Sequence, residues 1–199
     1  MPDTIQPRTL KTRARLVDAA EEVISETGFG AMRVEEVVRR AGVAKGTFFA
    51  HFRDKDALMD RLIGARIEAE LDRLAAQPAP TTVSDLVSAL MPLMDLMTCE
   101  RYVFDVILRH SGAAVVEEIG PIASTFERFV TVAASWIAQG PFRRDADPAL
   151  LAEGVQAFMF QAMALNFCSL NNTRPLRDRL TPFLDLWLPS HNPLDPQGQ

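Results

Sequence analysis

The sequence has little of what disulfide-stabilised, metal-binding or hydrolytic proteins need. Its two cysteines, Cys99 and Cys168, are too few for a disulfide framework or a four-ligand zinc site, so we expect two buried, reduced thiols. The three histidines, His51, His110 and His191, lie far apart, and no nucleophile–base pair, phosphate-binding loop or metal-ligand spacing accompanies them. The sequence therefore argues against an enzyme, and we expect no metal or other cofactor.

Long uncharged stretches are also scarce. The longest one runs from Gly154 to Thr173 and has the length of a membrane span. It contains two glutamines and three asparagines, so we interpret it as a buried helix of a soluble protein. Nothing near the N-terminus has the apolar core of a signal peptide. We therefore expect a cytoplasmic protein with no membrane partner.

Lysine is rare, and its positions are informative. All three lysines fall in the first 55 residues, where lysine and arginine number 10 against 8 acidic residues. Residues 56–199 carry 11 basic against 18 acidic residues, and the whole chain has a net charge of −5. An acidic body with a mildly basic N-terminal segment is compatible with a modular DNA-binding protein, although this charge signal alone is weak.

The sequence predicts helix nearly throughout, because apolar residues recur with a period of 3.6 and no alternating strand pattern is present. The first helix carries an apolar face, ends near Thr27 and is followed by Gly28, which suits a left-handed cap. In the fourth helix we expect Leu58, Leu62, Ala65 and Ala69 to form the buried stripe. The expected helices span about 9–27, 34–41, 45–51, 55–76, 82–97, 100–111, 121–140, 148–170 and 175–188 (the last beginning near Pro175 or at Thr181). The expected N-caps are Asp54 for the fourth helix, Thr82 or Ser84 for the fifth, and Asp147 for the eighth.

Two of these short helices form the most informative motif. The segments 34–41 and 45–51 are joined by a three-residue turn centred on Gly42, a residue that adopts positive φ without steric cost. Such a pair is typical of a helix-turn-helix, whose second helix can enter the major groove of DNA. The abstract pattern is only moderately specific, since many helical hairpins share it.

The full segment is more specific than this pattern. It has Gly28-Phe29-Gly30 after the first helix, Ala41-Gly42-Val43 in the turn, and Phe49-Ala50-His51-Phe52 at the end of the third helix. In these features, between Thr9 and about Asp60, the chain resembles the DNA-binding domain of the TetR/AcrR family of one-component bacterial regulators.

The resemblance implies an all-α architecture, with an N-terminal three-helix helix-turn-helix domain joined to a larger helical ligand-binding and dimerisation domain. Beyond the motif the chain matches the family only in layout. The expected parts are a flexible arm at 1–8, the DNA-binding domain at 9–54, a connecting helix at 55–76, an effector-binding and dimerisation domain at 77–188 and a disordered tail at 189–199. The two long helices at the end of the fourth part are expected to form the homodimer interface, with Trp187 as an anchor.

Three positions depart from the family pattern. Arg33 and Ala44 stand where threonine and serine usually cap the second and third helices, and each missing cap costs about 1 kcal/mol. Phe49 replaces a usual tyrosine and cannot donate a hydrogen bond. The changes affect the details of DNA contact rather than the fold.

The resemblance and the side-chain chemistry together predict the DNA-contacting residues. Lys45 can donate to guanine, Glu35 can accept from cytosine, and Thr47 offers both a hydroxyl and a methyl group. His51 and Lys55 occupy positions that suit phosphate contacts. The complete predicted set is Arg33, Glu35, Ala44, Lys45, Gly46, Thr47, Phe49, His51 and Lys55.

Simpler interpretations stand beside these roles. Taken alone, Lys45 would be a solvated lysine, His51 a structural histidine, and Glu35 a charge that favours a helix start. The basic residues near the N-terminus suit either a solvated run or an arm on the DNA backbone or in the minor groove; they are Arg8, Lys11, Arg13 and Arg15.

Methionine and phenylalanine recur at helical spacing in the C-terminal region. An ordinary core is one interpretation, and an adaptable apolar cavity between helices is the other. The candidate ligand-contacting residues are Met91, Met94, Tyr102, Phe104, Phe126, Phe129, Phe158, Met159, Gln161, Met163 and Phe167. Because few cations lie nearby, an apolar effector is favoured, while Arg101, Arg109 and Arg128 leave one carboxylate possible.

The sequence as a whole therefore predicts a DNA-binding transcriptional regulator. The first hypothesis is a homodimeric repressor that binds a pseudo-palindromic duplex and is released by a small, mainly apolar molecule. The alternative is a DNA-binding or architectural protein that needs no effector.

Overall fold

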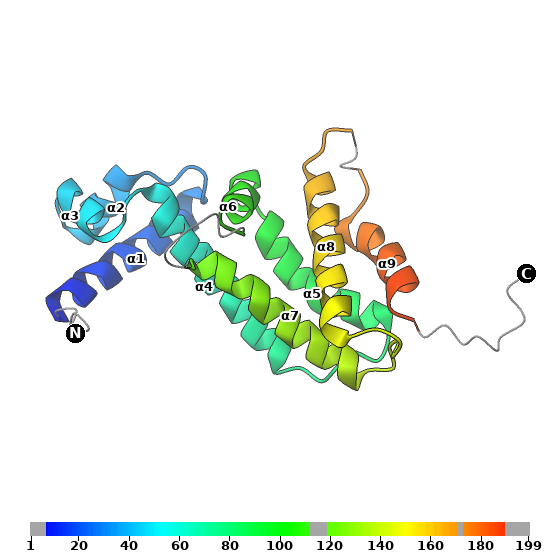
Figure 1. The fold of residues 1–199 in the computed structure, drawn as a ribbon. Helices are drawn as coiled ribbons and strands as arrows, with labels where there is room; N and C mark the ends of the chain where they lie inside the picture. Colours follow the sequence, from blue (N-terminus) through cyan, green and yellow to red (C-terminus); the bar gives the residue numbers. More distant parts are fainter. Residues whose placement is uncertain (1–6, 112–118, 171–172, 190–199) are drawn as a thin grey trace, which may run out of the picture. The chain divides into compact units, whose positions relative to one another are not determined.

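A computed structural model describes residues 7–111, 119–170 and 173–189. Regular secondary structure in this part of the chain is helical, apart from one isolated antiparallel bridge between Phe142 and Pro189. The predicted all-α fold class is confirmed (Figure 1). The chain divides into two compact units that do not follow chain order: Met1–Arg66 with Glu100–Ala123, and Ile67–Cys99 with Ser124–Gln199.

The first unit contains the helix-turn-helix. Helix α1 spans Pro7–Thr27, α2 spans Val34–Ala41 and α3 spans Lys45–His51, so α2 and α3 have their predicted bounds. They are drawn in blue and cyan in Figure 1. Gly42 has φ 63° and its amide bonds back to the end of α2, as the turn requires of a glycine.

A small apolar core holds these three helices together. Leu16 of α1, Val37 of α2 and Phe48 of α3 are all fully buried. Phe52, directly after α3, is also buried and lies 5.6 Å from Phe48 between ring centroids. The core therefore draws on all three helices, which fixes the orientation of α3 within its unit.

Two further helices contribute to the first unit. Helix α4 (Lys55–Ala75) begins after Asp54, whose carboxylate accepts a hydrogen bond of 2.8 Å from the Ala57 amide, as predicted for a cap. Only its first half belongs to this unit. Helix α6 (Arg101–Ser111) also belongs here, although the sequence placed it with the C-terminal domain.

The predicted buried stripe of α4 is correct only in its first two residues. Ala65 and Ala69 are exposed, while Ile63, Ile67 and Leu71 are buried. The stripe follows the larger side chains because they remove more apolar surface from water than alanine does.

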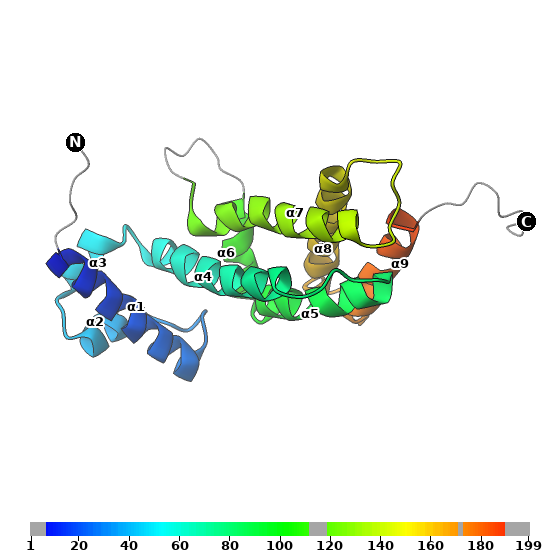
Figure 2. The same cartoon turned by 90° about the horizontal axis from the view of Figure 1, so that it is seen from below.

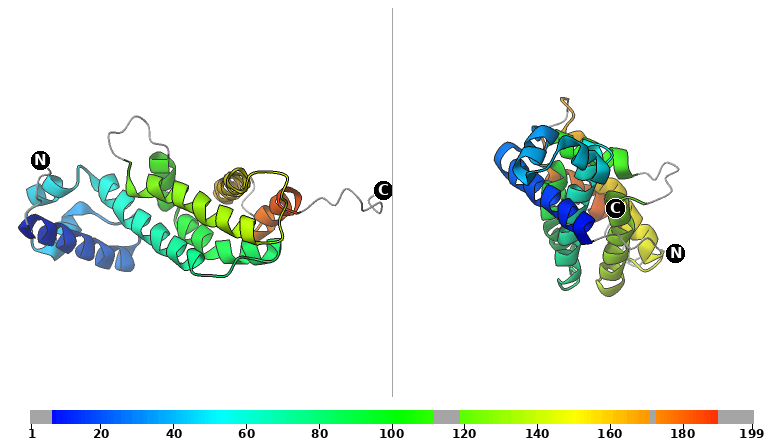
Figure 3. Two further views of the ribbon diagram at one scale, coloured as in Figure 1. Left: turned by 60° about the horizontal axis from the view of Figure 1, so that its bottom comes forward. Right: turned by 90° about the vertical axis from the view of Figure 1, so that its left-hand side faces the viewer.

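The second unit consists of the second half of α4, α5 (Val83–Thr98), most of α7 (Pro121–Gln139), α8 (Pro148–Asn166) and α9 (Leu176–Trp187). Figures 2 and 3 show α9 packed beside α8 and α5. The N-caps follow the sequence pattern: the Thr82 hydroxyl accepts from the Asp85 amide, and the Asp147 carboxylate accepts from the Ala149 amide.

Several expectations need correction or fall outside the described residues. Neither Cys99 nor Cys168 forms a disulfide, but the expected burial is wrong, because Cys99 is exposed and Cys168 half-buried. Helix α8 ends at Asn166, four residues earlier than predicted, and α1 starts two residues earlier. The expected arm up to residue 6 and the tail from residue 190 lie outside the described part.

Candidate nucleic-acid interface

The two residues predicted to meet base edges contact each other. The Lys45 ammonium, at the start of α3, lies 2.6 Å from a carboxylate oxygen of Glu35 in the first turn of α2. Both side chains are more than half exposed. The hydrogen bond from Lys45 holds the pKa of Glu35 below its ordinary value, so the carboxylate is charged at neutral pH. The surface thus presents one donor and one acceptor side by side.

Gly46 has no packing reason to be a glycine. Apart from its chain neighbours and the backbone of α3, a Cβ added there would meet no described atom within 4 Å, and the Gly46 backbone is not in the left-handed region. Glycine inside a helix costs roughly 1 kcal/mol relative to alanine. The missing side chain therefore leaves open space beside Lys45, which suits close approach of a partner to the backbone of α3.

An open polar groove lies between α1 and α3. It includes two predicted DNA-contacting residues, Thr47 and His51, both half-buried. The remaining lining was not in the predicted set, although two of its cations had been considered as part of an arm. The groove is lined by Thr9, Lys11, Thr12, Arg15, Val43, Thr47 and His51. Its lining includes two cations and no carboxylate, a composition that suits a phosphate group.

Three other predicted residues lie at the surface of the same motif. Arg33 and Ala44 precede α2 and α3 in extended backbone, and neither side chain caps its helix, as predicted. Phe49 is 49% exposed and packs edge-on against Phe48, with 5.3 Å between ring centroids. An exposed aromatic ring on α3 suits contact with a sugar or a thymine methyl group.

Lys55 differs from Lys45 because its ammonium group contacts a backbone carbonyl and an aromatic ring of the same unit. That group donates to the Gly30 carbonyl at 3.1 Å and lies 4.6 Å from the centre of the Tyr102 ring. Burial lowers the pKa of Lys55. Lys55 therefore links the start of α4 to α6 and to the loop before α2, and this structural role stands beside the predicted phosphate contact.

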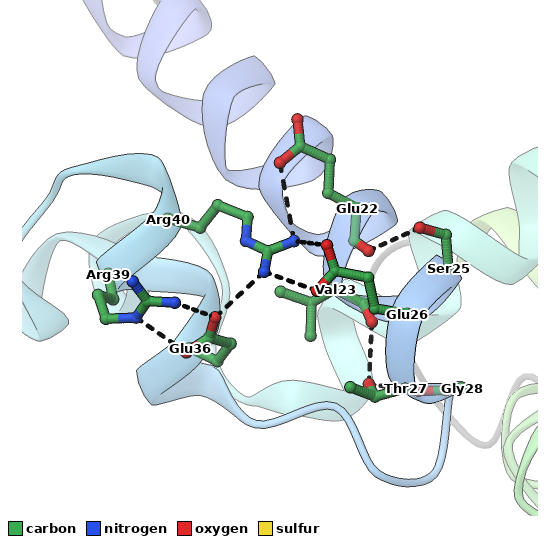
Figure 4. A network of polar contacts seen from close by, with 9 residues as sticks. All are labelled: Glu22, Val23, Ser25, Glu26, Thr27, Gly28, Glu36, Arg39 and Arg40. Carbon is green, nitrogen blue, oxygen red and sulfur yellow. Dashed lines mark hydrogen bonds and ion pairs between the residues drawn. The ribbon is translucent and has the colours of Figure 1, made fainter.

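The basic end of α2 is neutralised within the unit (Figure 4). Arg40 bonds to both carboxylate oxygens of Glu26 at 2.7 Å and to Glu36 at 3.3 Å, with Glu22 at 3.9 Å. Arg39 pairs with Glu36. These two arginines thus have a structural use. Arg15 of the groove has one as well, because its guanidinium donates to the Ala41 carbonyl at the end of α2.

The second unit has a small apolar cavity. Its volume is about 20 Å³, which is space for about one water molecule. Three predicted ligand residues line it: Phe126, Phe129 and Met159. Met97 and Phe160 also line it and belong to the methionines and phenylalanines that recur in the C-terminal region. The remaining lining residues were not predicted, and they are Ile67, Leu71, Leu93, Thr125 and Gln156. The i, i+3, i+4 spacing of Gln156, Met159 and Phe160 on α8 could have revealed their shared face.

The structure does not bring the remaining ligand candidates to this cavity. Met94 and Met163 are fully buried, Met91 and Phe167 are half-buried, and Gln161 is exposed. Phe158 stacks on Phe183 of α9, with 5.1 Å between ring centroids, and Tyr102 and Phe104 belong to the first unit.

Within the described ranges, no group of three or more histidine, cysteine or acidic side chains could hold a metal ion. None of the helices in these ranges is long and apolar enough to cross a membrane.

The helix-turn-helix, the exposed donor–acceptor pair and the cation-lined groove define a class: a helix-turn-helix DNA-binding protein. Residues 16–62 match the family described as "Bacterial regulatory proteins, tetR family". The resemblance seen in the sequence is therefore confirmed for this segment, which contains the helix-turn-helix.

Relatives with curated names are transcriptional regulators rather than enzymes. The chain is 28% identical to the HTH-type transcriptional repressor DhaR of Mycobacterium sp. (strain GP1), over 89% of this chain and 93% of DhaR. It is 30% identical to the HTH-type transcriptional regulator YvdT of Bacillus subtilis over 103 residues, which is about half the length of each protein.

Solved structures share the fold over most of the chain. The Thermus thermophilus TetR-family repressor FadR in complex with lauroyl-CoA has a TM-score of 0.61 at 22% identity, covering 88% of this chain and 92% of that one. The SmeT–triclosan complex has a TM-score of 0.57 at 20% identity, covering 92% and 93%. At these identities the likeness concerns the fold.

Proposed function

We propose that the protein is a homodimeric transcriptional repressor, acting in the cytoplasm, that binds a pseudo-palindromic operator and is released by a small, mainly apolar effector. The observation that carries the DNA-binding part is the groove between α1 and α3, whose lining holds Lys11, Arg15 and His51 without a carboxylate. Repression is supported by the full-length relative DhaR, which is named a repressor.

In this proposal the contacts divide by chemistry. Lys11, Arg15 and His51 bind phosphates, which fixes the position of α3 on the duplex. Lys45 and Glu35 face base edges, while Thr47, Phe49 and the open backbone at Gly46 contact sugars or thymine methyl groups. Arg33 adds a phosphate contact at the start of α2.

The homodimer is supported by uncharged surface on α8 and α9. Phe183 and Leu186, three residues apart on α9, are 40% and 78% exposed. On α8, Ala157, Gln161 and Ala164 form an exposed stripe without charge. Burying both surfaces against a second copy would remove them from water, and a two-fold axis would present two recognition helices to two half-sites.

The apolar character of the effector is supported by the arginines that could have bound a carboxylate. Each of them has an acidic partner: Arg101 pairs with Asp105, Arg109 with Asp56, and Arg128 with both Glu68 and Asp72. Lauroyl-CoA and triclosan, the molecules bound in two structures of this fold, both have a large apolar part.

An effector must enlarge the cavity, since about 20 Å³ is far below the roughly 300 Å³ of the smallest usual ligand sites. In the proposal the Phe126 and Phe160 rings, with centroids 5.1 Å apart, separate to admit it. The same tight packing favours a second candidate function, a DNA-binding regulator without an effector.

One set of measurements tests both candidates. The full chain is used to select duplexes from a pool with a randomised central region, and the mass of the complex is determined on the enriched duplex. The repressor proposal predicts an enriched inverted repeat with two half-sites and an even number of chains. A thermal-shift panel of straight-chain alcohols and halogenated phenols then follows. A compound that stabilises the protein and weakens operator binding supports the effector-released repressor. If no compound in the panel does both, the regulator without an effector is favoured. No enriched sequence contradicts both.

A further inference from the structure

Glu35 and Lys45 form an ion pair on a surface otherwise open to solvent. Their charged atoms lie 2.6 Å apart, and the side chains are 65% and 56% exposed. The distance is that of a charge-assisted hydrogen bond, so the two side chains hold each other in place. The empty space at Gly46 adjoins this pair along the chain.

A single base pair offers the complementary arrangement in the major groove. Guanine shows the acceptors O6 and N7, and its partner cytosine shows the N4 amino donor next to O6. An ammonium facing guanine and a carboxylate facing cytosine therefore match this edge with one donor and one acceptor. A thymine–adenine pair also offers a keto oxygen beside an amino group, but it lacks an acceptor equivalent to N7 beside that oxygen and carries a methyl group there.

The two reversed base pairs, C·G and A·T, do not match the charges of Lys45 and Glu35. In C·G and A·T an amino group faces the ammonium of Lys45 and a keto oxygen faces the carboxylate of Glu35, so both contacts are repulsive. A carboxylate near DNA phosphates is also unfavourable by itself. With Lys45 beside it, Glu35 keeps a cationic partner in the groove.

We propose that Glu35 and Lys45 act together as one reader of a single base pair in each half-site, with a keto base facing Lys45 and an amino base facing Glu35. The order of preference is G·C, then T·A, with C·G and A·T disfavoured. This inference rests on the proposed operator binding and adds its specificity at one position.

The test uses the full chain and the duplex enriched by the wild-type protein. Affinities are measured for all single base-pair changes in the half-sites, with wild type, Glu35→Ala, Lys45→Ala and the double variant. We expect wild type to favour G·C over C·G at one position by roughly tenfold or more. Each single variant should lose this preference at the same position, and the double variant should lose no more than either one, because the two residues act together.

Glu36→Gln is the matched control, since it removes one negative charge at the neighbouring position of α2, where the side chain bonds to Arg39 and Arg40. It should keep the preference. Loss of preference at two different positions, or an unchanged preference in Glu35→Ala, overturns the joint reading. If Glu35→Ala binds all sequences more tightly by the same factor and keeps the preference for G·C, the joint reading is also overturned. Glu35 would then only weaken DNA binding, irrespective of sequence. If wild type enriches no sequence, the operator proposal and this inference both fail.

Discussion

The carboxylate of Glu100 accepts a hydrogen bond of 2.7 Å from the backbone amide of Phe29, which lies 71 residues earlier in the chain. Its other oxygen accepts from the Gly30 amide at 2.9 Å. Glu100 directly precedes α6, and the two amides lie in the turn that leads from α1 to α2, where Gly28 has φ 85°. One side chain thus ties α6 to the helix-turn-helix.

Glu100→Ala should destabilise the first unit. Both amides lose a charged acceptor, and hydrogen bonds to charged groups contribute about 1.5–3 kcal/mol. We expect the free energy of unfolding in urea to fall by about 2 kcal/mol. Asp105→Asn, which removes an exposed ion pair with Arg101 on the same helix, should change it by less than about 1 kcal/mol. Equal effects of the two changes would argue against this role for Glu100.

Substitutions of Lys55 and Lys45 should affect different properties, thermal stability for Lys55 and operator affinity for Lys45. Lys55→Met removes the bond to the Gly30 carbonyl and the contact with the Tyr102 ring, so thermal stability should fall by the equivalent of about 1–2 kcal/mol. Lys45→Ala should lower operator affinity without changing the melting temperature. If Lys55→Met melts like wild type, Lys55 acts on DNA alone.

The ion pairs at the end of α2 predict a pH dependence. The hydrogen bond from Arg40 holds the pKa of Glu26 below its ordinary value of 4.5. The contribution to stability is therefore complete above about pH 4.5 and is lost as the pH falls through the lower pKa of the folded state. Urea unfolding of wild type and Glu26→Gln over this range measures it. The variant should show the weaker dependence, with Asp18→Asn as a control on α1; parallel curves for Glu26→Gln and wild type would refute the assignment.

Leu186→Glu should break the homodimer. Leu186 is 78% exposed on α9, and a carboxylate there would be desolvated without a partner if that face is buried in the dimer. Leu170→Glu is the control, because Leu170 is 88% exposed and lies beyond the end of α8. Light scattering should show monomers for the first variant and wild-type mass for the second. Wild-type mass for both would place the interface elsewhere.

Two phenylalanines of α8 test the cavity. Phe160→Ala removes one of the two rings proposed to separate, so less free energy is needed to open the cavity and an apolar probe should bind more tightly. Phe158→Ala, two positions away, removes a ring that stacks on Phe183. Titration with the fluorescent apolar dye N-phenylnaphthylamine should distinguish them. A gain in Phe158→Ala alone would favour the set of pocket residues expected from the sequence.

The local parts of this fold could be predicted because they depend on nearby residues. Gly42 marks the turn, Asp54 and Asp147 mark helix starts, and the bounds of α2 and α3 follow from the apolar period. The prediction of the buried stripe of α4 was partly wrong. Alanine at positions 65 and 69 fits the helical period, but its burial contributes little free energy.

Contacts between distant segments could not be predicted in the same way. Nothing near Glu100 or Lys55 in sequence indicates Phe29, Gly30 or Tyr102 as partners. The prediction of ligand-contacting residues was the least accurate, because methionine and phenylalanine at helical spacing are equally typical of a solid core and of a cavity. On α8, the helical phase of a residue indicates whether it lines the cavity better than its residue type does, because the phase groups Gln156 with Phe160.

In the proposed function, a symmetric pair of chains recognises a specific operator. The most direct measurement is a footprint of the purified full chain on the DNA upstream of its own gene, at physiological salt and with random-sequence competitor. We expect one protected segment containing an inverted repeat, whose two halves are protected at the same protein concentration. Protection of a single half-site, or uniform weak binding that the competitor abolishes, would contradict it.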